Sequence, residues 1–527
     1  MLKRVLIYIL IMHSSLSYTF WFSTTPKDST LTKRTWHVDT KKKKTDYEVI
    51  IIGSGVGGLS CGALLAKKGH KVLVLEQDEK IGGFCGSFEK DGFTFNIGVC
   101  DVSGIWKRGA TTFLLKQLGL KEEDLFVKNS RQFVFNNVEY SCTTKKETVD
   151  QLCKQFPKEK KQIMRFFADV NRLYDEMYGH EAITYGFPFT QELITDVLGT
   201  YALVSFPLSR PTVYKWHNTS YKQRLDTYFN DNQLKKFLCG LLCYTATPPE
   251  TTPALRGLGT CIGYIMFGGY YPKGGSQRFA NALKDIVEKN GGSILCNHNV
   301  EEIVVKNNLV QGVRVGKREY RAPIVVSNAN ALTTYKKFLK PQIISKDAMK
   351  ELQTIPLSTS AIVVHVALDC DLSHYHSIIT DINNDCHIVV NSAADPSIAP
   401  NGKGSTTIYL LGERTSSIPQ RETKEYDTYK KKQTQRALKM AETLVPELSK
   451  HVKFTIVETP HTFQRYTNMP DGALYAFDNG MNIKRPYFKT PIKGLYLASA
   501  STLYGAGIET VIMNGMACAH DICGWKI

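Results

Sequence analysis

The sequence lacks several features that mark whole classes of protein. Its 13 cysteines all follow residue 60, include no Cys-x-x-Cys pair, and leave Cys239 and Cys243 without partners for a zinc site. This distribution argues against a disulfide scaffold and predicts free, mostly buried thiols in a reduced compartment, with no metal. No internal repeat or low-complexity tract occurs after residue 45.

Nucleic-acid motifs are also missing, although the chain is basic. The net charge is +17, and about +10 remains when residues 1–45 are set aside. The lysines are scattered and no basic-aromatic motif occurs, so nucleic acid is not predicted as a partner. The excess positive charge favours an anionic partner such as a membrane surface. The alternative is that the basic residues only form a solvated surface.

The only strongly apolar run near the N-terminus is too short to span a membrane. Lys3 and Arg4 precede the apolar residues 5–12, and small residues follow at Ser15 and Ser17, as in a signal peptide covering residues 1–17. Residues 18–45 hold ten Ser/Thr and seven Lys/Arg but two acids, like a transit peptide. We expect residues 1–45 to be a targeting leader. Delivery to a plastid through the secretory route and an ER membrane location both remain open.

A nucleotide-binding pattern begins directly after this leader. The apolar run Val49–Ile52 predicts a buried parallel strand, and residues 59–67 predict a helix. Between them lies a Gly-x-Gly-x-x-Gly loop in which the first glycine permits a tight turn and the second permits approach of a pyrophosphate. The third lets helix and strand pack closely. The expected cofactor-binding residues of this loop are Gly53, Ser54, Gly55, Val56, Gly57 and Gly58.

A second predicted strand, residues 71–76, ends in Glu76, 23 residues after Gly53. A carboxylate at this position accepts hydrogen bonds from ribose hydroxyls and repels a 2′-phosphate. The alternative is an ordinary βαβ unit without a ligand. The chain has one such loop, so no stable NAD(P) site is predicted.

A second glycine turn, Gly82-Gly83, follows this unit and precedes the segment from Asp91 to Gly98. This pairing resembles the FAD-dependent superfamily of amine oxidases, phytoene desaturases, carotenoid isomerases and retinol saturases. The resemblance implies that FAD is the cofactor, and that Gly82 and Gly83 lie against its flavin end. Residues 268–277 resemble a further loop of this superfamily that nears the flavin.

The C-terminal segment narrows the resemblance. A predicted strand, residues 495–498, precedes Leu503–Val511, which resembles the terminal signature of the phytoene desaturase and prolycopene isomerase-like branch. The resemblance implies that a helix N-terminus there stabilises negative charge on reduced flavin. The implied cofactor-binding residues are Gly505, Ala506, Gly507 and Ile508. Ala500 replaces a common acid, so Ser499 or Ser501 is expected to substitute as a hydrogen-bond partner.

These segments predict an α/β fold in which a Rossmann-like, doubly wound and mostly parallel FAD-binding domain is interleaved with an α+β substrate domain. Residues 234–245 are strongly apolar and predict a core helix, or one that lines a lipophilic tunnel or dips into a bilayer. Strands are predicted at residues 361–368 and 406–411. The expected boundaries are 46–150, 256–334 and 456–527 for the FAD-binding parts, and 151–255 and 335–455 for the substrate parts.

The resemblance implies an FAD-dependent oxidoreductase or isomerase that acts on a lipophilic polyene at a membrane periphery. Cis-trans isomerisation, desaturation and saturation of a carotenoid all remain open, and so does the oligomeric state. Glu509 is the candidate acid or base, or only a carboxylate in a first helical turn. Alternatives are an amine or protoporphyrinogen oxidase-like enzyme, with Tyr475 and Tyr504 as an aromatic cage, and a non-catalytic escort of prenylated proteins.

Overall fold

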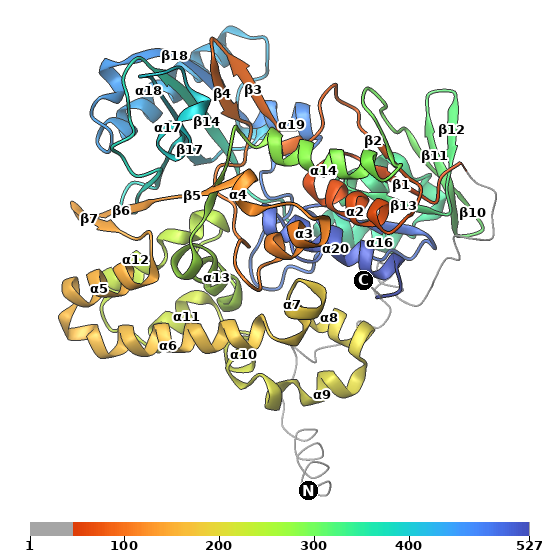
Figure 1. The fold of residues 1–527 in the computed structure, drawn as a ribbon, viewed down its shortest axis with the longest axis horizontal. Helices are drawn as coiled ribbons and strands as arrows, with labels where there is room; N and C mark the ends of the chain where they lie inside the picture. The colour runs from red at the N-terminus through yellow and green to blue at the C-terminus, as the bar shows by residue number, and fades with distance from the viewer. Residues whose placement is uncertain (1–45, 526–527) are drawn as a thin grey trace, which may run out of the picture.

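The computed structural model describes residues 46–525, so the predicted leader lies outside the described residues. The described chain forms two main sheets and a layer of short helices (Figure 1). Within this part of the chain, every helix is too short or too polar to span a bilayer.

The first sheet joins strands from three distant parts of the sequence. All neighbours run parallel, in the order β19-β13-β1-β2-β9. The β1 and β2 residues are fully buried, as expected for strands covered on both faces. This topology confirms the predicted doubly wound α/β fold. The strands are β1 (Val49–Ile52), β2 (Val72–Leu75), β9 (Ser293–Leu295), β13 (Ile324–Ser327) and β19 (Leu495–Leu497).

Alternate residues of these strands enter different cores. Ile51 and Val74 pack with helices α2, α14 and α20, while Ile50 and Leu73 pack with a three-stranded antiparallel sheet on the opposite face. Helix α2 lies against both α14 and α20. The covering elements are α2 (Val56–Lys67), α14 (Gln277–Lys289), α20 (Ile508–Ile522), β10 (Glu302–Lys306), β11 (Leu309–Val315) and β12 (Arg318–Arg321).

The second sheet has seven strands in the order β18-β14-β17-β16-β15-β6-β7. Its β14 and β17 correspond to the strands predicted at residues 361–368 and 406–411. Helix α18 (Lys424–Glu442) packs on it through Ala437 and Ala441. The strands are β6 (Arg131–Phe135), β7 (Val138–Ser141), β14 (Ser360–Leu368), β15 (Ile378–Asp381), β16 (Cys386–Val390), β17 (Gly404–Gly412) and β18 (Val452–Glu458).

This sheet corrects two predicted boundaries. Residues 131–141 were assigned to the FAD-binding part 46–150, yet β6 pairs in parallel with β15 of the other sheet. The boundary at 455 falls inside β18. Pairing between strands more than 240 residues apart is a tertiary property, which local hydrophobic patterns do not report.

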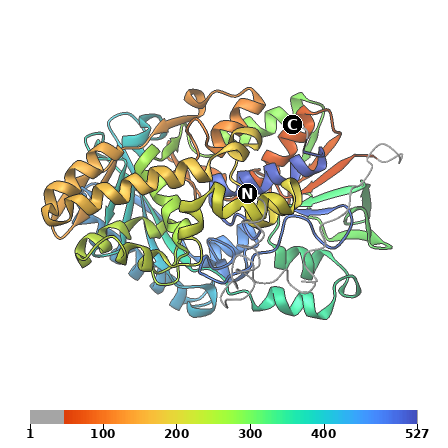
Figure 2. The ribbon, with the colours of Figure 1, turned by 90° about the horizontal axis from the view of Figure 1, so that it is seen from below.

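Short helices form the layer beneath both sheets (Figures 1 and 2). The apolar segment 234–245 is not one helix, because α12 ends at Leu238 and a 3-10 turn, Gly240–Tyr244, follows. The helices of this layer are α5 (Lys145–Gln155), α6 (Lys160–Met177), α7 (His180–Tyr185), α8 (Gln191–Leu193), α9 (Thr200–Ser209), α10 (Pro211–Trp216), α11 (Tyr221–Asp226), α12 (Asn232–Leu238) and α13 (Ala254–Thr260).

Shorter elements connect these units. The hairpin of β3 and β4 follows the second glycine turn, and β5 pairs with β8 near the predicted flavin-proximal loop. They are β3 (Ser87–Lys90), β4 (Phe93–Asn96), α3 (Ala110–Leu118), α4 (Glu122–Leu125), β5 (Phe126–Lys128), β8 (Tyr270–Pro272), α15 (Ala331–Thr333), α16 (Lys346–Thr354), α17 (Asn391–Ala394) and α19 (Pro460–Thr467).

Candidate functional site

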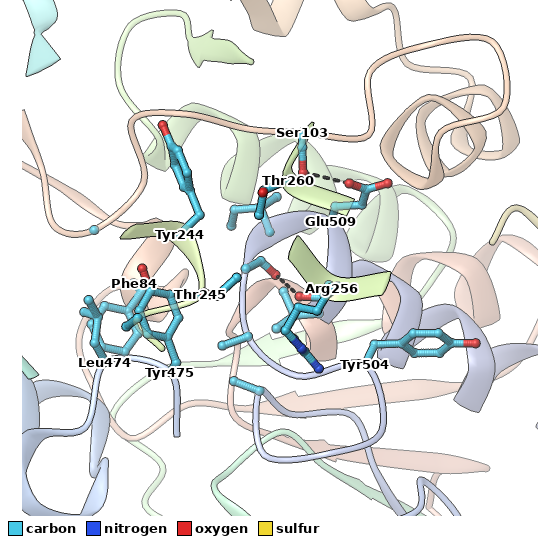
Figure 3. A pocket seen from close by; sticks show the side chains of 18 of the residues that line it. Phe84, Ser103, Tyr244, Thr245, Arg256, Thr260, Leu474, Tyr475, Tyr504 and Glu509 are labelled. Atoms are coloured by element: carbon cyan, nitrogen blue, oxygen red, sulfur yellow. Dashed lines mark hydrogen bonds between the residues drawn. The ribbon is translucent and has the colours of Figure 1, made fainter. Parts of the chain in front are cut away.

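One cavity of about 1500 Å³ runs between the two sheets and the helical layer. Its wall includes the loop after β1, the start of α20, and residues 239–250 of the helical layer. Pockets for single drug-sized ligands occupy about 300–1000 Å³, so this space is large enough for a dinucleotide and a second molecule. Figure 3 shows part of its lining.

The first glycine loop has no room for side chains. Gly53 has a φ of +88°, which favours glycine. A Cβ at Gly57 would lie 2.1 Å from the carbonyl oxygen of Ala498, and one at Gly58 would lie 2.5 Å from that of Gly53. The packing role predicted for Gly58 is therefore confirmed, although Gly58 does not itself line the cavity.

Donors and an acceptor converge where α2 begins. Within residues 46–525 the N–H groups of Val56 and Gly57 have no hydrogen-bond partner, and both residues line the cavity. Glu76 also lines it, and its Oε2 accepts a 2.7 Å hydrogen bond from the Ser54 N–H. A second bond from Asp78 N–H to Oε1 fixes the carboxylate in place. This is the arrangement expected for a pyrophosphate and a ribose.

The second glycine turn lies directly against the first. Gly82 has a φ of +113° and Gly83 one of +55°. The Gly82 N–H donates to the Ser54 carbonyl at 3.1 Å, and Gly82 pairs with Gly55 in an isolated bridge. The structure thus brings Gly82 and Gly83 to the cavity wall, as the resemblance implied.

Helix α20 supplies a second open N-terminus. It begins at Ile508 after Gly507, which has a φ of +120° and, as glycine, no side chain that could cap the helix. Ala506, Gly507 and Ile508 line the cavity, and no described group accepts from the N–H groups of residues 508–510. Gly505 lies behind them with a φ of +84° and shapes the turn. Partial positive charge at this helix end favours an anionic group in the cavity.

Ser499 does not take the position that we expected. It is 1 % exposed and does not line the cavity. Its hydroxyl lies 2.6 Å from that of Ser501, and Ser501 in turn accepts from the Ala331 N–H. Neither Ser499 nor Ser501 lines the cavity in this structure.

Glu509 is buried on the first turn of α20 and faces the cavity. The Ser103 hydroxyl donates to Oε2 at 2.7 Å, and the Ala110 N–H and the Tyr178 hydroxyl also interact with the carboxyl. Burial raises the pKa of Glu509 from 4.5 to about 7, and these hydrogen bonds offset the rise only in part. The carboxyl can therefore exchange a proton near neutral pH, as an acid or base requires.

Sequence reasoning missed a polar cluster in the substrate half. Arg131 on β6 forms a buried ion pair with Asp101, and the Tyr244 hydroxyl also donates to Asp101. The Tyr244 and Tyr264 rings stack at 4.0 Å, and burial lowers the pKa of His387 to about 4. Since Asp101, Tyr244, Tyr264 and His387 line the cavity, this cluster gives its apolar half a polar wall.

Arg256 on α13 was also missed. It lines the cavity, and Figure 3 places it among Thr245, Tyr475 and Tyr504. One sequence signal could have identified it, because Arg256 is the single charged residue from 254 to 267. Tyr475 and Tyr504, the expected aromatic pair, both line the cavity, with the Tyr475 hydroxyl donating to Cys243 O and that of Tyr504 to Pro188 O.

All 13 cysteines are free, which confirms the predicted thiols. Four of those closest to the site, Cys85, Cys100, Cys239 and Cys243, line the cavity. Burial raises the pKa of Cys100 to about 11 and that of Cys243 to about 12, so these thiols stay protonated.

Comparison with known proteins agrees with this geometry. The family described as flavin containing amine oxidoreductase matches residues 56–523. The chain is 27% identical to the chloroplastic prolycopene isomerase of Arabidopsis thaliana, over 90% of this chain and 82% of that protein. It is 25% identical to the all-trans-retinol 13,14-reductase of Danio rerio, over 90% and 86%. A solved putrescine oxidase double mutant shares the fold, with a TM-score of 0.62, 16% identity, and 91% and 99% coverage.

Proposed function

Because the chain belongs to the family of flavin-containing amine oxidoreductases, we propose that it is an FAD-dependent enzyme that acts on a lipophilic polyene. The family membership gives the cofactor and the broad class of oxidoreductase. The polyene is the proposal. It draws support from the relatives named for prolycopene isomerisation and retinol reduction.

The residues present fit FAD. The open N-termini of α2 and α20 provide N–H donors for a pyrophosphate and for the flavin pyrimidine, and Glu76 provides an acceptor for a ribose. Gly55 and Gly57 keep the loop free of side chains that would fill this space. When bound, FAD supplies the hydride or electron transfer, while the protein orients the substrate and excludes water.

The observation that carries the proposal is the continuity of the cavity. The same space that holds the glycine loops extends past Glu509 into walls formed by Tyr178, Phe189 and Leu242. A long apolar molecule placed there would reach the α20 N-terminus without leaving the protein interior. Burying apolar surface is favourable by roughly 25 cal/mol per Å², which suits a hydrocarbon chain.

Glu509 is the group that could hold or move a proton beside such a substrate. Its carboxyl lines the cavity and its pKa is near 7, so a protonated and an ionised form are both accessible at neutral pH. Ser103 keeps the carboxyl oriented. Saturation of a double bond adds a proton to a carbon atom, and desaturation removes one. Isomerisation leaves the number of protons on the substrate unchanged.

The test is product analysis with the purified full-length protein and FAD. We would supply a cis-carotenoid or retinol, with the flavin either oxidised or photochemically reduced under anaerobic conditions. Products would be separated by chromatography, and their molecular masses would be determined by mass spectrometry. Conversion without a change in mass indicates an isomerase, and a change of two hydrogens indicates a saturase or desaturase. No conversion of either polyene, together with oxidation of amines, would contradict the proposal.

The amine oxidase alternative is disfavoured by charge. A protonated amine at the α20 N-terminus would approach Arg256, which lines the same part of the cavity. Arg256 and the helix end are both positive, so the site repels a cationic substrate. The non-catalytic escort alternative is disfavoured because such proteins have degraded FAD contacts, whereas here the glycine loops and Glu76 are in place for a dinucleotide.

We further propose that the enzyme docks on a membrane surface through helix α9. Its Tyr201 and Leu208 are 85% and 81% exposed, while Phe206 on the same helix is buried and lines the cavity. An apolar helix at the surface is typical of membrane contact. No Asp or Glu occurs from 197 to 225, which suits anionic lipid headgroups. Because the plant relatives are named chloroplastic, we propose a plastid membrane.

A further inference from the structure

The Arg256 guanidinium has no bonded partner among the described residues. In residues 46–525 its side chain forms neither a hydrogen bond nor an ion pair, although it lies inside the protein and lines the cavity. Burial lowers its pKa, and the Asp478 carboxylate opposes this only in part. Asp478 is itself engaged by the Gly480 N–H at 2.6 Å. An unpaired cation away from bulk water is costly, so proteins retain one where a ligand completes it.

A second guanidinium adds to the positive charge. Arg485 lies near Gly505, at a position where a Cβ would meet both Arg256 Nη1 and Arg485 Cζ at 3.4 Å. Arg485 donates to the carbonyl oxygens of Ala500 and Phe477 at 2.8 and 2.6 Å, so its donors are used within the protein. Burial, and then the charge of Arg256, lower the pKa of Arg485 to about 9. Arg256 is therefore the cation of this pair with its donors still free.

We propose that Arg256 binds an acceptor oxygen on the substrate, so that the substrate is a polyene with a carboxylate, or more weakly a carbonyl or hydroxyl, rather than a pure hydrocarbon. This inference rests on the proposed function and narrows its substrate class. A guanidinium presents a planar fork that matches a carboxylate through two parallel hydrogen bonds. The apolar walls accept the polyene chain, and Arg256 fixes which part of it lies beside the α20 N-terminus.

Arg256 and the neighbouring N–H donors come from different parts of the fold. The N–H groups belong to the backbone at the start of α20, just after the glycine turn Gly505–Gly507, which we call the motif turn. Arg256 is on α13 in the helical layer. The wall beside it continues through Thr245, Tyr475 and Leu474 into the substrate half. The position of Arg256 thus joins the substrate half to the motif turn, which favours a substrate contact over a second flavin contact.

The experiment compares three polyenes on the purified full-length holoprotein. Retinoic acid, retinol and the analogue with a terminal methyl group differ only in their polar end. Their dissociation constants would be measured at pH 8 by quenching of protein fluorescence, for the wild type, Arg256→Met and Arg256→Lys. The control is Arg278→Met, because Arg278 is exposed and lies outside the cavity. FAD occupancy would be read from the visible spectrum of each variant.

We expect the wild type to bind retinoic acid most tightly. Arg256→Met should weaken that binding by about 10- to 100-fold, as for loss of hydrogen bonds to a charged group, and leave the methyl analogue unchanged. Arg256→Lys should recover part of the loss, since it restores the charge without the fork. Arg278→Met should match the wild type.

Two results would overturn the inference. In one, Arg256→Met weakens all three ligands equally. In the other, it releases FAD while the order of the ligands stays the same, which would assign the guanidinium to the cofactor. Failure of the wild type to bind any of the three polyenes would instead contradict the proposed function, so the two failures are distinguishable.

Discussion

The two halves of the cavity are built in different ways. The dinucleotide half consists of backbone N–H groups and glycines from short contiguous loops, such as Gly53 to Gly58 and Gly505 to Ile508. The substrate half consists of side chains that come from separate helices and strands, such as His387 on β16 and Tyr244 on the helical layer. A half made from backbone is intolerant of any side chain, whereas a half made from side chains can be altered one contact at a time.

The largest effect is expected in the backbone half. In Gly57→Ala the new Cβ would meet the Ala498 oxygen at 2.1 Å, so β19 and α2 must separate, and we predict loss of FAD binding. Visible absorbance of the purified protein measures the amount of bound FAD. Gly69→Ala is the control, because no atom lies near its Cβ; its positive φ adds backbone strain that Gly57, inside α2, does not have. It should cost about 1–2 kcal/mol of stability and keep FAD. Equal FAD content in both variants would contradict the comparison.

The next effect tests the buried ion pair of the substrate half. Arg131→Met leaves Asp101 without its cation, and the two side chains are 3% and 5% exposed. We predict a loss of about 3–5 kcal/mol in the free energy of unfolding. Denaturant titration measures it. Lys146→Met, which breaks the exposed Lys146–Asp150 pair, should cost less than about 1 kcal/mol. Similar losses in the two variants would show that the cluster is not structural.

Glu509 joins the two halves and should make stability depend on pH. The folded protein holds a proton on Glu509 up to about pH 7, whereas the unfolded chain loses it near 4.5. Stability of the protein without FAD should therefore fall by about 3 kcal/mol as pH rises across that interval. In Glu509→Gln this contribution is absent. Unfolding measured between pH 4 and 8 would show it, and parallel curves for the two proteins would contradict the burial of this carboxyl.

The smallest effect on the enzyme itself is expected at the surface. Tyr201→Ser with Leu208→Ser removes two exposed side chains of α9, so stability and FAD content should not change. Binding to vesicles of anionic lipid should fall at least about tenfold, since each buried apolar side chain contributes roughly 1.5–3 kcal/mol. Cosedimentation measures it. Val138→Ser, an exposed apolar residue on β7, should bind vesicles like the wild type, and a loss of binding there would contradict α9 as the docking site.

Much of the backbone half could be predicted from sequence. The order of strand, glycine loop, helix and carboxylate identifies β1, α2, β2 and Glu76, because each residue has a local conformational reason to be there. The edge strand β19 followed from the C-terminal motif that it precedes. The sequence placed Ser499 and Ser501 beside the motif, but it could not show that their hydroxyls contact each other away from the cavity.

The polar contacts of the substrate half could not be predicted, because they join residues that are far apart in the sequence or on different elements. Asp101 and Arg131 meet only after β6 has joined a sheet whose next strand, β15, begins at Ile378. Arg256 and Gly505 come together across 249 residues of sequence. Neither pairing leaves a periodic signal, since the partners belong to different elements. A lone charge within an apolar run, as at Arg256, is the one local sign of such a site.

The central claim is that FAD and a polyene share one cavity. The most direct measurement is the visible difference spectrum of the purified full-length protein, first alone and then with retinol or a cis-carotenoid. We expect a bound flavin that absorbs at roughly 450 nm, and a shift of that band when the polyene binds beside it. A colourless protein, or a flavin band that is unmoved by polyenes and bleached by an amine, would contradict it.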